Sequence, residues 1–138
     1  PMDDVVPGEI PGSWYEVGLE GYEKYSGPNG DVLNEFSTVF PEGAVTYTFD
    51  PGGGLMIVRN VNTDMAQTRY GEWHLEGNRL TIFEEGNEQS YTTTVIKLTA
   101  TELVTEYRSA NVEDGYELYE KNTYIRKQVE ELPPAILH

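Results

Sequence analysis

The fold class is indicated by one short stretch, residues 71–82, which reads GEWHLEGNRLTI. At its centre Gly77 and Asn78 both tolerate positive φ, so they suit the two-residue loop of a β-hairpin. The cross-strand pairs that this loop predicts are Glu76 with Arg79, Leu75 with Leu80, and Trp73 with Ile82. Because the apolar pairs share one face and opposite charges flank the turn, the stretch predicts antiparallel strands in a well-specified register.

A second hairpin is predicted just before this one. Val45, Tyr47 and Phe49 alternate with polar residues, and a period of two is typical of a β-strand. The glycine-rich residues 50–54 then turn the chain into an apolar run at 55–58. This pattern predicts two more antiparallel strands.

A third hairpin is predicted around residues 98–103, which read LTATEL. A four-residue loop there predicts the pairs Leu98 with Leu103, Ile96 with Thr105, and Thr94 with Tyr107. Further strands are expected at 13–19 and at 119–127.

Residues 20–43 are the least regular part of the chain. Residues 26–30 read SGPNG and predict a turn. After it, the apolar residues of 32–40 are spaced like one face of a helix that Asp31 could cap. We therefore expect a short helix or an ordered flap here, with a short strand at 36–40 as the alternative.

These elements predict an all-β domain of about eight strands, nearly all joined to their sequence neighbours. Such an antiparallel up-and-down order can close into an eight-stranded barrel, which removes exposed strand edges. A two-sheet β-sandwich is the rival architecture. The predicted organisation is an extended leader at 1–11, a barrel domain at 12–128 with a long flap segment at 20–43, and a C-terminal tail at 129–138.

The composition of the chain argues against several classes of function and site. The chain has 138 residues and a net charge of -15, and such a surface repels nucleic acid and anionic membrane surfaces. There are no cysteines, which excludes disulfides, thiolate metal sites and cysteine nucleophiles. No apolar run has the roughly 20 residues of a transmembrane segment. No nucleic-acid partner and no membrane span are expected from this chain.

Several short motifs resemble those of one family. Gly12-Ser13-Trp14 resembles the Gly-x-Trp signature of lipocalins, and the whole pattern is most similar to short lipocalin-like domains of exported bacterial lipoproteins, of the Bacteroidetes type. The further motifs that carry this resemblance are Tyr47-Thr48-Phe49-Asp50, Gly71-Glu72-Trp73 with Gly77-Asn78-Arg79-Leu80, and Leu98-Thr99-Ala100-Thr101-Glu102-Leu103. The long C-terminal helix and the disulfides of classical lipocalins have no counterpart here.

The resemblance implies a lipocalin-like barrel and export to the periplasm or the cell surface. The chain begins at Pro1 rather than at an initiator methionine, so we expect that a segment upstream has been removed. A signal peptide or a lipid anchor is a candidate for that segment.

Candidate ligand-binding residues are those on strand positions that we expect to face the barrel interior. Tyr47, Phe49 and Tyr107 would offer apolar area with hydroxyl groups that orient a ligand. Ile57 and Trp73 join them, although the simpler interpretation of Trp73, as of Trp14, is that it packs one end of the barrel.

Arg59 is the candidate for a charged contact. If Val45 pairs with Arg59, its side chain points the same way as Tyr47 and Ile57 and can meet a ligand carboxylate. A register shifted by one residue would place Arg59 in solvent. We favour the surface placement, since arginine is rarely buried without a partner.

Catalytic and metal sites are not predicted. His74 lies between Trp73 and Leu75 and should face away from both, and His138 lies in the tail. Without a nucleophile motif, a phosphate loop or a metal-ligand pattern, we predict no enzyme activity and no cofactor.

The sequence leads to two main hypotheses of function; a third, an unrecognised hydrolase, would need a cleft with a perturbed carboxylate or His74. The first is a non-enzymatic binding module that takes a small, partly apolar ligand, its expected partner, in the lumen. The second is a filled barrel that serves as a structural or protein-interaction domain of an exported bacterial envelope protein. The size of the lumen separates them, because a packed core holds no cavity larger than a few waters.

Overall fold

The computed structural model of this protein describes residues 10–60 and 66–127, and they form β-strands without a helix. The strands are β1 (Gly12–Gly27), β2 (Gly30–Val39), β3 (Val45–Phe49), β4 (Gly54–Asn60), β5 (Ala66–Glu76), β6 (Arg79–Glu84), β7 (Tyr91–Leu98), β8 (Glu102–Asn111) and β9 (Tyr116–Arg126). This part of the chain therefore has no helix that could span a membrane. The expected tail, and the expected leader up to residue 9, lie outside the described residues.

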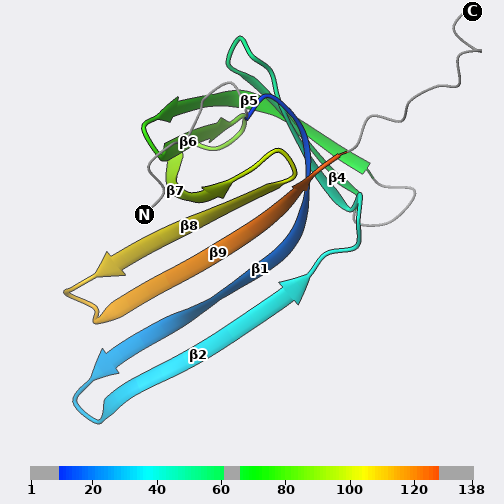
Figure 1. Ribbon diagram of the computed structural model, residues 1–138. Helices are drawn as coiled ribbons and strands as arrows, with labels where there is room; N and C mark the ends of the chain where they lie inside the picture. The colour runs from blue at the N-terminus through cyan, green and yellow to red at the C-terminus, as the bar shows by residue number, and fades with distance from the viewer. Residues whose placement is uncertain (1–9, 61–65, 128–138) are drawn as a thin grey trace, which may run out of the picture.

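A single antiparallel sheet closes on itself to form the barrel (Figure 1). Strands β3 to β9 pair in sequence order, and β1 pairs with both β3 and β9. These eight strands close the barrel, and β2 is one extra strand that pairs with β1 outside it. The predicted eight-stranded up-and-down barrel is thus confirmed, and the two-sheet sandwich is not formed.

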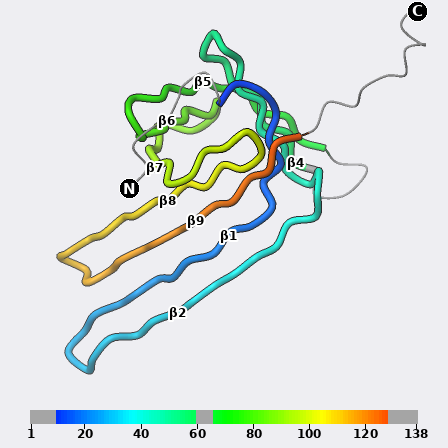
Figure 2. The backbone as a smooth tube through the Cα atoms, in the orientation of Figure 1, coloured from blue at the N-terminus to red at the C-terminus, as the bar shows by residue number. Residues whose placement is uncertain are grey.

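Four long strands carry the sheet beyond the barrel. Strands β8, β9, β1 and β2 are neighbours in the sheet and project together to one side, which Figure 2 shows most clearly. The β1–β9 pairing continues from Trp14 opposite Arg126 as far as Tyr25 opposite Tyr116. One end of the barrel is therefore continued by a four-stranded sheet.

The segment 20–43 does not form the expected helix. Its first part extends β1 to Gly27, a turn follows at residues 28–29, and β2 then pairs with β1 from Gly30 to Val39. Val39, one of the apolar residues on the expected helical face, is 83% exposed, so no other element of the described residues covers it. The open backbone edge of β1 instead supplies a full ladder of hydrogen bonds. The alternative of a strand at 36–40 was closer, although β2 is longer.

Two of the predicted registers are confirmed. The hairpin of β5 and β6 pairs Trp73 with Ile82 and Leu75 with Leu80. The hairpin of β3 and β4 pairs Val45 with Arg59, the register on which the inward direction of Arg59 depended.

The third hairpin has the predicted loop but a different register. Leu98 pairs with Leu103 as expected, whereas Val95, not Ile96, lies opposite Thr105 because a β-bulge falls between Val95 and Lys97. The bulge lets Val95 and Leu98, three residues apart, both turn into the core, while Ile96 is left exposed. The predicted pairs Ile96 with Thr105 and Thr94 with Tyr107 are therefore wrong.

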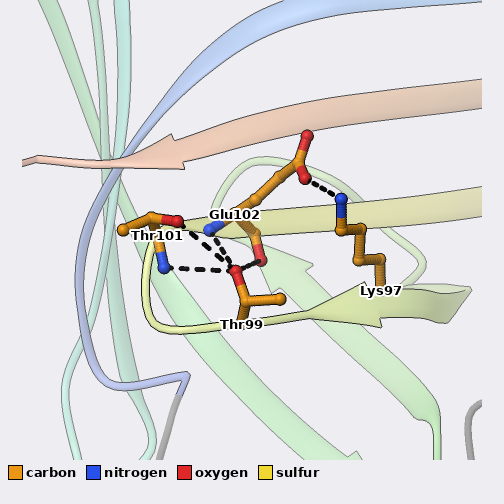
Figure 3. Close-up of polar contacts among 4 residues, drawn as sticks. All are labelled: Lys97, Thr99, Thr101 and Glu102. Atoms are coloured by element: carbon orange, nitrogen blue, oxygen red, sulfur yellow. Dashed lines mark hydrogen bonds and ion pairs between the residues drawn. The ribbon is translucent and has the colours of Figure 1, made fainter.

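Side chains of the β7–β8 loop fix its shape (Figure 3). The Thr99 hydroxyl oxygen accepts hydrogen bonds from the backbone N–H of Thr101 at 3.3 Å and of Glu102 at 2.9 Å. An ion pair between Lys97 and Glu102 joins the two strands beside it. The loop is thus stabilised locally, which explains why its position could be predicted from six residues.

Candidate functional site

The barrel holds a cavity of about 370 Å³, lined by residues from β1, β3, β6, β7, β8 and β9. The deep wall consists of buried residues such as Phe49, Leu80 and Leu103. Leu19 and Tyr107 are half-buried lining residues, and they belong to strands that continue beyond the barrel. The cavity therefore opens at the end where the four long strands project.

Five aromatic rings contribute to the wall, namely Tyr47, Phe49, Tyr91, Tyr107 and Tyr124. Tyr47 is stacked on Phe49 at a centroid distance of 6.2 Å and meets the Tyr124 ring edge-on at 5.4 Å. Aliphatic residues fill the space between the rings. The result is a largely apolar wall with phenol hydroxyls set into it, which is the usual make-up of a small-molecule site.

Two carboxylates, Glu16 and Glu120, also line the cavity. Glu16 is 8% exposed and lies on the same inward face of β1 as Trp14, two residues before it. Burial raises the pKa of the Glu16 carboxyl, and the charge of Arg59 and hydrogen bonds with Tyr124 and Asn122 oppose that rise. The deep end of the cavity thus contains an acid whose charge is poorly solvated.

The buried phenols around Glu16 stay protonated over the physiological range. Burial raises the pKa of Tyr47, of Tyr91 and of Tyr124. Neutral phenols can both donate and accept hydrogen bonds, so the wall can adapt to either kind of polar group on a ligand.

The opposite end of the barrel is closed by Trp14, which is 0% exposed. Its indole Nε1 donates a hydrogen bond to the backbone oxygen of Ile10 at 2.8 Å, and the Arg126 guanidinium lies over the ring at 4.1 Å. Trp14 does not line the cavity. The geometry supports the structural interpretation of this residue.

Of the six predicted ligand-binding residues, Tyr47, Phe49 and Tyr107 line the cavity and Ile57, Arg59 and Trp73 do not. Ile57 is buried in the core. Trp73 meets Phe49 edge-on at 5.6 Å and donates a hydrogen bond from Nε1 to the backbone oxygen of Asp50 at 2.8 Å. Trp73 thus supports the wall from behind, as the packing interpretation expected.

Arg59 is half-buried and paired within the protein. Its two guanidinium nitrogens lie 2.8 and 3.4 Å from the carboxylate oxygens of Glu84. The favoured surface placement does not describe it well, because the confirmed register turns it inward and Glu84 is the partner that makes this burial tolerable.

Sequence reasoning missed Glu16, Tyr91, Tyr124 and Glu120. Glu16 follows Trp14 by two residues, so the period of a strand puts both on one face, but charged side chains are mostly found at the surface. In β9 the inward residues Tyr124, Asn122 and Glu120 include two polar side chains, so no apolar alternation marked that face. Burial of polar groups around a cavity is the reason that hydrophobic patterning failed here.

The family assignment comes from comparison with known proteins. The model of the lipocalin-like domain matches residues 10–105, more than half of the chain. The chain belongs to the lipocalin-like domain family. The resemblance drawn from the sequence motifs is confirmed, and members of this family generally bind ligands rather than catalyse reactions. No curated protein sequence matches this lipocalin-like chain.

Solved structures share the fold at low sequence identity. A lipocalin-like protein from Bacteroides uniformis is 18% identical with a TM-score of 0.60, over 87% of this chain and all of that one. Insecticyanin from the tobacco hornworm Manduca sexta is 9% identical with a TM-score of 0.63, over 99% of this chain and 71% of that one. Lobster apocrustacyanin A1 is 14% identical with a TM-score of 0.58, over 94% of this chain and 66% of that one. These likenesses show the lipocalin fold alone.

Outside the cavity, two features of the described residues bear on catalysis, a histidine and the absence of a metal-binding group. His74 is exposed, as predicted, and its Nε2 lies 3.9 Å from a carboxylate oxygen of Glu76. Within residues 10–60 and 66–127 no three His, Asp or Glu side chains gather in a group that could hold a metal ion.

Proposed function

We propose that this lipocalin-like chain is a non-enzymatic binding domain that takes a small, partly apolar ligand into its barrel. The observation that carries the proposal is the cavity of about 370 Å³, which falls within the range of roughly 300–1,000 Å³ found for ligand sites. A barrel filled by its own side chains would hold only voids of a few waters. The cavity therefore favours binding over a purely structural role.

The composition of the wall supports the same proposal. Rings and aliphatic side chains supply apolar area, and phenol, amide and carboxyl groups from separate strands converge on the space. Among the described residues, the cavity lining contains neither serine nor histidine, so it offers no Ser–His pair for nucleophilic catalysis. Binding needs only what the lining provides.

The proposal can be tested with N-phenyl-1-naphthylamine, a neutral probe at pH 7.5 whose fluorescence rises in apolar sites. We expect saturable one-to-one binding to the wild-type protein. Thr105→Phe, which places a ring in the cavity from β8, should abolish it, because Thr105 is a lining residue that is 2% exposed. Val112→Phe adds the same ring at a position that is 93% exposed and should leave binding unchanged.

Native mass spectrometry of freshly purified protein complements this titration and would identify a co-purified ligand by its mass. Probe binding that survives Thr105→Phe, in a variant with an unchanged circular dichroism spectrum, would contradict binding in the lumen. Absence of probe binding to the wild-type protein would contradict it as well.

A further inference from the structure

The charge inside the cavity has one sign. Glu16 and Glu120 line it, and no lysine or arginine is among the lining residues in the part of the chain that the structure describes. Glu16 belongs to the deep end and Glu120 to the half-buried side formed by the long strands. A ligand in this space meets carboxylate oxygens at two depths.

Arg59 does not reverse that sign. Its charge reaches Glu16 and its side chain hydrogen-bonds the lining residue Tyr47, but its guanidinium is forked onto Glu84 at 2.8 and 3.4 Å. Arg59 itself is not a lining residue. In and beside the cavity, the guanidinium of Arg59 therefore stands against three carboxylates, those of Glu16, Glu84 and Glu120. A ligand carboxylate brought to Glu16 would be repelled at short range, where the low-dielectric surroundings strengthen the repulsion.

The rings around Glu16 suit a cation. Tyr47, Tyr91 and Tyr124 line the same cavity as Glu16, and the Tyr124 side chain forms a hydrogen bond with the Glu16 carboxylate. The faces of such rings attract an ammonium group, and the attraction increases where water is excluded. The phenol oxygens can in addition accept hydrogen bonds from its N–H groups.

An ammonium group would also offset the electrostatic cost of burying the Glu16 carboxylate. Burial disfavours the ionised form of Glu16. A cation beside the carboxylate favours that form and receives a charge-assisted hydrogen bond in return. Apolar residues further along the wall, Phe49, Leu80 and Ile82, leave room for a hydrophobic body.

We propose that the ligand of this cavity is an amine: a protonated primary or secondary ammonium group bound at Glu16, carried on an aromatic or aliphatic body that packs against the apolar wall. This assignment rests on the proposed lumen-binding function and specifies its ligand class.

The test uses three probes with the same naphthyl body, namely 2-(1-naphthyl)ethylamine, 2-(1-naphthyl)ethanol and 3-(1-naphthyl)propanoate. Isothermal titration at pH 7.5 in 0.15 M salt limits the general attraction of cations to a chain of net charge -15. We expect the affinity for the amine to be at least about tenfold higher than that for the alcohol, and the affinity for the carboxylate to be the lowest of the three.

Glu16→Gln should remove the preference for the amine and leave alcohol binding within about threefold. Glu113→Gln, in the exposed β8–β9 loop, makes the same change in net charge and should keep the preference. Should Glu16→Gln fail to fold, Glu120→Gln at the half-buried side tests the same preference, with a smaller expected loss.

Equal affinity for the amine and the alcohol would overturn the amine assignment while leaving lumen binding intact. An amine preference that persists in Glu16→Gln, or that is lost equally in Glu113→Gln, would also overturn it. If neither these probes nor N-phenyl-1-naphthylamine bind, both this assignment and the proposed function fail.

Discussion

Glu16 is the residue at which fold stability and the proposed binding of an amine make opposite demands. The side chains that face or influence it are Arg59 on β4, Tyr47 on β3, Tyr91 on β7, and Glu120, Asn122 and Tyr124 on β9. Burial outweighs the favourable members of this set and raises the pKa of Glu16. The folded protein thus holds the Glu16 proton more tightly than the unfolded chain does.

This imbalance predicts a pH dependence with a definite sign. As pH rises from the ordinary glutamate pKa of 4.5 to the raised value, the folded state loses stability relative to the unfolded chain. Glutamine does not ionise, so Glu16→Gln should be more stable than wild type at pH 7.5, and this advantage should shrink at pH 4. Urea unfolding of both proteins at the two pH values measures the difference. A difference that does not change with pH would contradict the prediction.

Trp14 contributes to stability and is not a residue of the cavity lining. It is fully buried, donates to the Ile10 oxygen and lies under the Arg126 guanidinium. Trp14→Ala should lower the free energy of unfolding by about 3–5 kcal/mol, the usual cost of removing a large buried side chain. Thermal and urea unfolding test this, with Val112→Ala at an exposed position as the neutral control. A loss below about 1 kcal/mol would show that Trp14 does not hold the closed end of the barrel.

At the level of elements, β1 shows how one strand belongs both to the barrel and to the projecting part of the same sheet. It begins in the barrel beside β3, passes a register shift between Glu16 and Gly18, and ends beside β2 in the projecting sheet. Its partner β9 approaches closely at Gly21, where a Cβ atom would lie 1.9 Å from the backbone oxygen of Tyr119. Gly21 is therefore required by the close approach of the two strands.

A matched pair of glycines on β1 tests this requirement. Gly21→Ala should destabilise the protein by about 1–3 kcal/mol because the strands must move apart. Gly18→Ala, three residues earlier, brings its Cβ no closer than 3.9 Å to Thr123 and should be neutral or slightly stabilising. Both values come from urea unfolding at pH 7.5. Equal effects of the two substitutions would show that close approach at Gly21 does not constrain β1.

Elements with local signals could be predicted from the sequence, and elements set by long-range pairing could not. The Gly77-Asn78 loop carried its own register, which the structure confirms. The bulge beside Ile96 depends on two core positions, Val95 and Leu98, whose burial no local motif announces. The strand β2 forms because it can pair with the free edge of β1. The spacing of its apolar residues indicated a helix instead, so the strand was not predicted at its full length.

The same division applies to the candidate site. Tyr47 and Phe49 were found because alternation with polar residues marked the inward face of β3. Glu16, Tyr91 and Tyr124 were missed because their place in the wall depends on closure of the barrel, which brings β1, β7 and β9 around one space. Apolar patterning identifies a core, but it does not identify polar side chains that face a cavity.

On the scale of the whole molecule, the closed barrel and the projecting sheet differ in their expected stability. The core side chains belong to the barrel, whereas β2 is an edge strand whose residues are exposed except Phe36. Local opening is easiest where few apolar contacts are lost. We therefore expect the β2 amides to exchange with deuterium much faster than those of β4 and β6. Equally slow exchange in β2 would show that the whole sheet opens as one unit.

Ligand entry can be followed by the same measurement, because the cavity opens where β1, β8 and β9 leave the barrel. Saturation with N-phenyl-1-naphthylamine should slow deuterium exchange in the barrel half of these strands and in β3 and β6, which also line the cavity. It should leave β2, none of whose residues line it, unchanged. The Thr105→Phe variant, with its lumen occupied, should show no change in exchange on adding the probe. Slower exchange in β2 with an unaffected β3 would instead place the probe on the projecting sheet and refute entry into the barrel.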